Sequence, residues 1–308
     1  MTIIVLEGPD GGGKSTLARR IIEHDALLSK RRYLIHRGPI RSDPLTEYLR
    51  PLDEAVSDAE QGLESVFVLD RWHVGERIYG PILRGRSRLT KTQAVYIEMV
   101  LQSLGCCFLH VSQPIHALEQ RWDIEPDDLI KKDQLREIAN KYWEYTFWHD
   151  HWATISPTED APIPFNLEVV INTRTPAPLP GKYIGPKKPK VLILGDARAA
   201  NGLNWSWPFV PQGHLSGDWL LEAMLAANVQ YMSVGLVNAC ELTTHDLYKL
   251  WQDLQHPAVI SLGRNAEKAW KQLSINTGIR IHHPQYMRRF HMSDKETYGK
   301  IIKEQMRG

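Results

Sequence analysis

A glycine-rich segment near the amino terminus has the residue types needed to hold phosphate groups. The sequence GPDGGGKST (8–16) fits the pattern GxxxxGK[ST], in which small residues let backbone N–H groups and a helix amino terminus surround phosphates. We expect Lys14 to reach the β- and γ-phosphates of ATP and Ser15 to bind Mg²⁺. The predicted nucleotide-binding residues are Gly8, Gly11, Gly12, Gly13, Lys14, Ser15 and Thr16.

The segments beside this motif predict the strand and helix between which such a loop lies. TIIVLEG (2–8) reads as a buried strand, and the spacing of TLARRIIEH (16–24) is typical of a helix. A second apolar segment, VFVLD (66–70), ends in Asp70 and is followed by Arg71. An acid at the carboxyl end of a strand beside a phosphate loop organises Mg²⁺, so Asp70 is a second candidate metal ligand.

The rest of the first half alternates between predicted strands and helices. We expect strands at 106–112 and 167–173 and helices at about 90–104 and 132–148. This alternation is typical of an α/β fold, with a parallel sheet covered by helices on both faces.

Composition places the chain among ordinary globular proteins. Its 308 residues suggest two domains, and 43% are hydrophobic. No run of about 18 apolar residues and no signal-peptide pattern is present, so we expect a soluble, cytoplasmic protein with no membrane partner. The three cysteines, Cys106, Cys107 and Cys240, form no disulfide framework and no CxxC metal site, which indicates reduced thiols.

The net charge of +1 hides a difference between the two halves. Residues 1–180 contain 21 Lys and Arg against 26 Asp and Glu, and residues 181–308 contain 16 against 10. The second half therefore has a charge of about +6, which favours a polyanionic partner such as DNA.

A proline-rich segment separates the halves. Residues 172–190 contain five prolines and two glycines and have no helix or strand periodicity, which predicts an extended connector. We therefore expect a first domain at 1–173, a linker at 174–189 and a second domain at 190–308.

The second half predicts another three-layer α/β domain. KVLILGD (190–196) reads as a buried strand, and a helix is expected to begin near Ser216. A second strand ends at Asn238, and HPAVISLGRNAEKAW (256–270) reads as a strand and a helix. IRIHHP (279–284) reads as a final strand and turn.

Residues 1–173 resemble thymidylate kinases. LEGPDGGGKST is similar to that family's phosphate loop with an acid inside it, here Asp10, and DRWHVGERIYG is similar to its Asp-Arg motif. Residues 117–145 resemble its lid and the long helix that follows. The resemblance implies that Arg71 holds the acceptor, Asp10 contacts its sugar or hydroxyl, and Arg121 closes over the phosphates. Trp72 and Tyr79 are candidates for stacking on a base or for structural packing.

Residues 190–308 resemble the uracil-DNA glycosylase superfamily. The resemblance rests on Gly195-Asp196, Pro208-Phe209, Asn238, the segment SLGRNAEKAW and His283-Pro284, in that order. It implies that Asp196 is the water-activating acid, Phe209 stacks on a flipped base, Asn238 reads the pyrimidine edge and His283 belongs to a loop in the minor groove. We expect Tyr286 and Met287 to insert into the base stack while Arg288 and Arg289 hold phosphates.

The glycosylase pattern is incomplete in this chain. The usual proline after the acid is absent, and Gln285 replaces the usual serine after His-Pro. The cysteines of an iron–sulfur cluster are also missing. These departures favour base recognition without cleavage of the glycosidic bond.

A kinase combined with a base-reading module suggests an acceptor within DNA. Some bacteriophages carry 5-hydroxymethyluracil in their DNA, and the kinases that phosphorylate this base in the polymer resemble thymidylate kinases. The chain resembles those kinases, which implies ATP, Mg²⁺ and modified DNA as its ligands. Three alternatives remain open: a kinase for dTMP or 5-hydroxymethyl-dUMP, a bifunctional kinase and glycosylase, and a non-catalytic DNA-binding ATPase. A homodimer is also open, since thymidylate kinases are commonly dimers.

Overall fold

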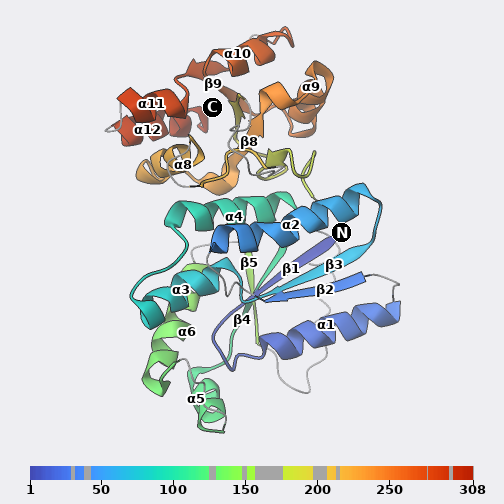
Figure 1. Cartoon of the computed structure of the whole chain (residues 1–308), viewed down its shortest axis with the longest axis vertical. Helices are drawn as coiled ribbons and strands as arrows, with labels where there is room; N and C mark the ends of the chain where they lie inside the picture. The colour runs from blue at the N-terminus through green and yellow to red at the C-terminus, as the bar shows by residue number, and fades with distance from the viewer. Residues whose placement is uncertain are drawn as a thin grey trace. The chain divides into compact units, whose positions relative to one another are not determined.

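The computed structural model forms two compact units, whose elements are labelled in Figure 1. The first unit comprises Met1–Thr90 and Gly105–Thr175, and the second comprises Lys91–Leu104 and Pro176–Gly308. The structure describes residues 1–28, 32–37, 43–124, 130–147, 151–156, 176–196, 207–212, 216–275, 277–290 and 294–307. No described helix is long and apolar enough to cross a membrane.

The first unit contains a five-stranded parallel sheet in the order β2-β3-β1-β4-β5. The three middle strands are buried along almost their whole length, as parallel strands covered on both faces require. Figure 1 shows α1 on one side of these strands and α2 on the other. The strands are β1 (Thr2–Glu7), β2 (Arg32–Arg37), β3 (Ser65–Asp70), β4 (Cys107–Val111) and β5 (Trp152–Ile155). The helices are α1 (Lys14–Leu28), α2 (Pro44–Glu60), α3 (His73–Arg84), α5 (Ile115–Ile124) and α6 (Lys132–Phe147).

Alternation along β1 sends side chains to two different environments. Ile4 and Leu6 pack with Leu17 and Ile21 of α1 in one apolar cluster. Glu7 points to the opposite face, where it meets α3 and α6. The position of Glu7 in the strand therefore decides which helices it can bind.

The second unit contains a mixed five-stranded sheet in the order β10-β9-β7-β8-β6. Strand β6 pairs antiparallel with β8, and the other pairs are parallel. The strands are β6 (Tyr183–Ile184), β7 (Val191–Gly195), β8 (Val234–Asn238), β9 (Ala258–Leu262) and β10 (Ile279–Ile281). The helices are α8 (Ser216–Ala226), α9 (Thr244–Asp253), α10 (Arg264–Lys271), α11 (Pro284–Phe290) and α12 (Lys295–Gln305), with short 3₁₀ turns η1 (Tyr231–Ser233) and η2 (Ala239–Glu241).

The α/β class predicted for both halves is confirmed, as are the described strands and helices on which it depended. The strand expected at 167–173 lies outside the described residues. Strands β2 and β5 were not predicted. Both lie at the edges of their sheet, where polar residues interrupt the apolar pattern.

Part of the proline-rich segment expected to be an extended connector forms a strand of the second sheet. Tyr183 and Ile184 are fully buried and pair with Val237 and Leu236 of β8. The Tyr183 ring lies over Gly235, where a Cβ atom would come within 2.7 Å of it. The sequence predicted an extended connector but not this strand pairing, because a two-residue strand among prolines is too short to show periodicity.

Helix α4 (Lys91–Ser103) is grouped with the second unit although it precedes β4 in the chain. The Tyr96 hydroxyl donates to the Pro208 carbonyl oxygen at 2.6 Å, and the Tyr231 hydroxyl donates to Glu98 at 3.0 Å. The Ala177 N–H donates to the carbonyl of Ser103, the last residue of α4, at 2.7 Å. Helix α4 thus holds the segment that carries Phe209, and nothing in the sequence pattern predicted this grouping.

Replacing Tyr96 with Phe should lower the free energy of unfolding by about 1–3 kcal/mol, because the buried Pro208 carbonyl loses its donor. Urea denaturation of the intact chain measures this change. The matched control is Tyr248→Phe, whose side chain is 40% exposed and whose change should stay within about 0.5 kcal/mol. Equal effects of the two substitutions would contradict the role given to α4.

Candidate active site

The glycine-rich segment forms a tight loop between β1 and α1. Gly8 has φ of +151°, and a Cβ atom there would lie 2.1 Å from the Val111 carbonyl oxygen of β4. Only glycine fits this position without moving the strand. The loop closes through a hydrogen bond from the Gly12 N–H to the Pro9 carbonyl oxygen at 3.1 Å, and α1 begins at Lys14. Its backbone N–H groups at the start of α1 provide the anion site expected from the motif.

Lys14 folds across the loop that precedes it. Its Nζ donates to the carbonyl oxygens of Gly8 and Pro9 at 2.8 Å each, and the side chain is almost fully buried. Burial lowers the pKa of Lys14, and the nearby carboxylate of Asp10, 3.9 Å from Nζ, raises it. The ammonium group therefore lies beside the loop amides that would surround a triphosphate. Ser15 and Thr16 follow in the first turn of α1.

Ser15 and Asp70 form a pair of hard oxygen donors next to the loop. The Ser15 hydroxyl donates to Asp70 Oδ2 at 3.1 Å. Asp70 is 2% exposed, and its Oδ1 has no hydrogen-bond partner among the described residues. A buried carboxylate oxygen without a partner is costly unless a cation binds it. This donor set fits Mg²⁺ with further ligands from phosphates and water. The described residues contain no group of three or more His, Cys, Asp or Glu side chains arranged for a metal.

Three further charged residues surround the loop. Arg71 Nη2 lies 2.5 Å from Asp10 Oδ1 in an ion pair, and the Asp10 N–H donates to the Tyr79 hydroxyl at 2.9 Å. Arg71 has φ of +60°, and its N–H donates to the Leu6 carbonyl oxygen. On α5, Arg121 Nη1 donates to the Gly11 carbonyl oxygen at 2.9 Å. The structure thus brings together the catalytic residues expected from the sequence: Asp10, Lys14, Asp70, Arg71 and Arg121.

The sequence reasoning missed Glu7, the residue immediately before the loop. Its side chain is fully buried, and Oε1 accepts hydrogen bonds from the N–H groups of Val74 and Gly75 at 2.9 and 3.1 Å. Oε2 accepts from the Tyr142 hydroxyl of α6 at 3.1 Å. Glu7 therefore ties the start of α3, which follows Arg71, and α6 to β1. The signal in the sequence was an acid ending an otherwise apolar strand.

Glu7 and His110 lie side by side on β1 and β4, and burial shifts the pKa of each toward its uncharged form. Burial raises the pKa of Glu7 to about 7, and hydrogen bonds from Gly75, Tyr142 and Val74 together with the charge of Lys14 limit the rise. Burial also lowers the pKa of His110 to about 4. The Tyr142 ring stacks on His110 with 5.9 Å between ring centroids. A polar cluster of this kind is stable only while its members keep their partners.

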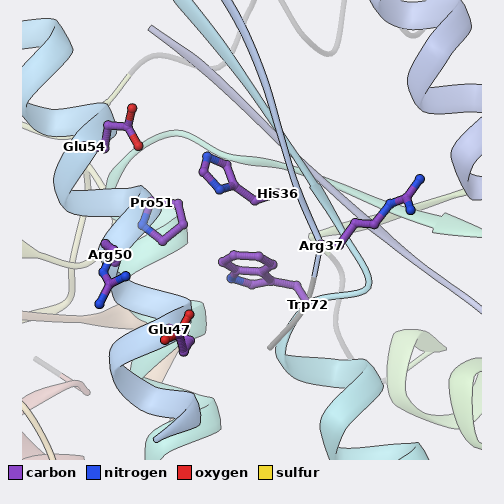
Figure 2. Close-up of a pocket in the computed structure, with 7 residues that line it drawn as sticks. All are labelled: His36, Arg37, Glu47, Arg50, Pro51, Glu54 and Trp72. Atoms are coloured by element: carbon purple, nitrogen blue, oxygen red, sulfur yellow. The ribbon is translucent and has the colours of Figure 1, made fainter. Parts of the chain in front are cut away.

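A cavity of about 260 Å³ lies at the carboxyl ends of β2 and β3 (Figure 2). Trp72, directly after Arg71, is 2% exposed, and its Nε1 has no hydrogen-bond partner among the described residues. Figure 2 shows the Trp72 and His36 rings on one side and residues of α2 on the other. Aromatic rings, charged side chains and an unpartnered donor suit a small polar ring such as a base. The lining residues are His36, Arg37, Glu47, Arg50, Pro51, Glu54 and Trp72.

The two aromatic candidates have different surroundings. Trp72 lines this cavity and packs edge-on against Tyr48 with 4.9 Å between ring centroids. Tyr79 instead accepts the hydrogen bond from Asp10 and packs against Tyr142, which gives it a structural position. The lining residues of β2 and α2 were missed because neither element was predicted.

The second unit has its own cluster at the carboxyl ends of β7 and β8. Gly195 pairs with Asn238 across these strands, and a Cβ atom on Gly195 would lie 2.3 Å from the Phe209 ring and 2.9 Å from Asn238 Oδ1. Asn238 is 5% exposed, and its Nδ2 donates to Glu241 at 3.1 Å. Phe209 has φ of +57° and is half-buried. A ring and an amide therefore face the same glycine, at the edge where ligands bind in parallel sheets.

Both carboxylate oxygens of Asp196 are engaged. Oδ1 accepts from the Cys240 thiol at 3.1 Å, and Oδ2 accepts from Asn265 Nδ2 at 2.7 Å. Burial raises the pKa of Cys240 to about 11, with a further contribution from its hydrogen bond to Asp196. Burial lowers the pKa of His283, and the negative charge of nearby Asp196 opposes this change. Its Nδ1 accepts the Gln285 N–H at 3.1 Å.

The segment after His283 is a helix, contrary to the predicted groove-entering loop. Pro284 is the first residue of α11, a position that proline favours. Met287 is 9% exposed and faces the interior, so the prediction that it inserts between bases is wrong. Tyr286 is 44% exposed, Arg289 is exposed and Arg288 is half-buried.

Comparison with known proteins gives matches only among solved structures. No protein-family model and no curated protein matches the sequence. The YorR protein of Bacillus subtilis, solved in complex with phosphorylated GDP, is similar over 50% of this chain and 85% of its own, with 20% identity and a TM-score of 0.40. Deoxyadenosine kinase from M. mycoides, solved with bound dATP, is similar over 56% of this chain and 98% of its own, with 14% identity and a TM-score of 0.31.

Replacing Glu7 with Gln should remove a pH-dependent loss of stability. Below pH 4.5 the carboxyl is protonated whether the chain is folded or unfolded, and between pH 4.5 and about 7 only the folded state keeps the proton. The free energy of unfolding of the unmodified chain should therefore fall with rising pH, by about 3 kcal/mol relative to Glu7→Gln, and then level off above pH 7. Urea denaturation of both proteins at pH 5 and pH 8 measures the difference. If the difference in unfolding free energy between the two proteins were the same at pH 5 and pH 8, it would contradict the raised pKa of the buried Glu7.

Proposed function

We propose that this chain is an ATP-dependent kinase that phosphorylates the hydroxymethyl group of 5-hydroxymethyluracil in DNA. The observation that carries the proposal is the presence of two sites in one chain. The first unit holds Lys14, Asp10 and Arg71 around a phosphate loop. The second unit holds Phe209 and Asn238 around Gly195 in a unit rich in basic residues. The resemblance of residues 1–173 to thymidylate kinases supports the first site, and that of residues 190–308 to uracil-DNA glycosylases supports the second.

The first site supports phosphoryl transfer. Lys14 and the loop N–H groups hold the β- and γ-phosphates of ATP, and Ser15 with Asp70 would hold Mg²⁺, which neutralises charge on the phosphate oxygens when bound. The hydroxymethyl oxygen forms a bond to the γ-phosphorus while the bond from that phosphorus to the β–γ bridging oxygen breaks and ADP leaves. Asp10 orients the hydroxyl and accepts its proton. Arg71 and Arg121 stabilise the charge on the transferring group.

The second site supports recognition of a pyrimidine. Phe209 offers a ring for stacking, and the Asn238 amide offers an acceptor for a pyrimidine N3–H. His283, Tyr286, Arg288 and Arg289 lie on the segment that we assign to DNA contacts. Because both oxygens of Asp196 already accept hydrogen bonds, the site favours binding of the base without activation of water for its release.

A second candidate function is phosphorylation of a free nucleotide, dTMP or 5-hydroxymethyl-dUMP. The cavity beside Trp72 favours it, since about 260 Å³ lies just below the range of pockets for drug-sized molecules and suits one base. Under this function the second unit has no part in choosing the acceptor. The two functions therefore differ in what a change in the second unit does to catalysis.

Lys14→Ala should abolish transfer of label from γ-labelled ATP to every acceptor, because the cation at the loop is lost. A filter-binding assay of labelled product measures this. Lys141→Ala is the matched control, since Lys141 forms only a surface ion pair with Glu137 and should retain full transfer. Transfer that survives Lys14→Ala would contradict the assignment of the loop.

Gly195→Ala should reduce phosphorylation of modified DNA at least about tenfold while leaving the affinity for ATP unchanged, because the new Cβ displaces Phe209 and the phosphate loop lies in the other unit. Initial rates with modified DNA and the dissociation constant of ATP measure the effect, and thermal unfolding checks that the variant is folded. Gln252→Ala is the control, since Gln252 is exposed on α9, where alanine suits the helix, and it is not one of the residues around Gly195. Equal, non-zero rates on modified DNA for Gly195→Ala and the unmodified chain would contradict the role given to the second unit.

A further inference from the structure

Three aromatic side chains follow one another along the surface of the second unit. Tyr286 and Phe290 are four residues apart on α11, the spacing that places side chains on one side of a helix, and His282 lies two residues before this helix. The ring centroids of His282 and Tyr286 are 4.9 Å apart with an interplanar angle of 25°. Those of Tyr286 and Phe290 are 5.0 Å apart with an angle of 45°. The three rings form a continuous row.

This row lies on the solvent side of α11. Pro284 and Met287 are the buried residues of the helix. Tyr286 is 44% exposed and Phe290 is 67% exposed, which makes them two of the most exposed large apolar side chains among the described residues of this unit. Most of the Phe290 ring is therefore accessible to a partner. Adjoining exposed rings of this kind indicate a binding surface more often than isolated ones do.

Two arginines accompany the rings. Arg288 and Arg289 occupy the last turn of α11, and neither forms an ion pair with a carboxylate among the described residues. Residues 181–308 contain 16 basic against 10 acidic side chains, so the surrounding charge favours an anionic partner. We call His282, Tyr286, Arg289 and Phe290 the ring face; Arg288 is half-buried and lies two residues from each helical ring, away from this row.

We infer that the ring face binds single-stranded DNA, with bases stacked on the aromatic rings and a phosphate held by Arg289. Stacking on aromatic side chains combined with cationic contacts to the backbone is how proteins bind unpaired strands without reading their sequence. A protein partner or a second copy of this chain would not need both features together. The inference rests on the proposed function for the choice of DNA, since enzymes that do chemistry on a base act on single-stranded substrate or extrude the base from a duplex.

Fluorescence anisotropy with a labelled, unmodified single-stranded oligonucleotide and no ATP tests the inference. Phe290→Leu combined with Tyr286→Leu should weaken binding at least about tenfold, given roughly 5- to 150-fold per stacked base. The slope of log affinity against log salt concentration should not change in this variant. Arg289→Gln should reduce that slope by about 0.7. Tyr286→Phe keeps the ring and should bind like the unmodified chain.

Two controls separate stacking from charge and from general damage. Tyr248→Leu removes a tyrosine that is 40% exposed on α9 and should leave binding unchanged. An oligonucleotide of abasic sites keeps the phosphates but has no bases, so the double leucine variant should bind it as the unmodified chain does. Full affinity of the double leucine variant for the base-bearing strand would overturn the inference. So would a loss of self-association in that variant with no loss of DNA binding.

The outcome does not depend on catalysis. Unmodified DNA contains no acceptor hydroxymethyl group, so a protein that fails to phosphorylate modified DNA can still show ring-dependent binding. Conversely, kinase activity on modified DNA with no effect of the ring variants on binding would overturn the ring face alone.

Discussion

The buried carboxyl group of Glu7 is the constraint on which the first unit depends. It ends β1, and it binds the amino terminus of α3 and the Tyr142 hydroxyl of α6. Arg71 lies just before α3, and Asp10 lies just after the strand, so the ion pair between them is held at both ends by elements that meet at Glu7. An acid can occupy this site because it receives three hydrogen bonds, two of them from the positive end of a helix. The geometry of the phosphate site therefore depends on a residue that contacts no phosphate.

The second unit depends on a different constraint, the absence of a side chain at Gly195. The Phe209 ring and the Asn238 amide occupy the space that a Cβ atom would fill. Phe209 is held in turn by a backbone φ of +57° and by the neighbouring Pro208, whose carbonyl is bound by Tyr96 of α4. The chain thus places a ring and an amide together through one glycine, one strained residue and one hydrogen bond from a distant helix. Such a pair suits a flat, polar ligand such as a base.

Motifs with fixed spacing could be predicted well from the sequence, and contacts between distant segments could not. The phosphate loop, Asp70 and the strands around them follow from local patterns, and the structure places Lys14, Ser15 and Asp70 as that pattern requires. Glu7 was missed because its role depends on α3 and α6, which are far away in the sequence. The grouping of α4 with the second unit was missed for the same reason, and β6 was missed because two residues are too few to show periodicity. Met287 was misjudged because Pro284 begins a helix that turns this side chain inward.

The most direct test of the central claim supplies γ-labelled ATP and Mg²⁺ to four matched acceptors: dTMP, 5-hydroxymethyl-dUMP, plain DNA and DNA containing 5-hydroxymethyluracil. Each DNA product is then digested to nucleosides to locate the label. Our account predicts that label appears on the base of the modified DNA and on no other acceptor. Label on the free monophosphates alone would contradict it and would leave a nucleotide kinase whose second unit does not select the acceptor.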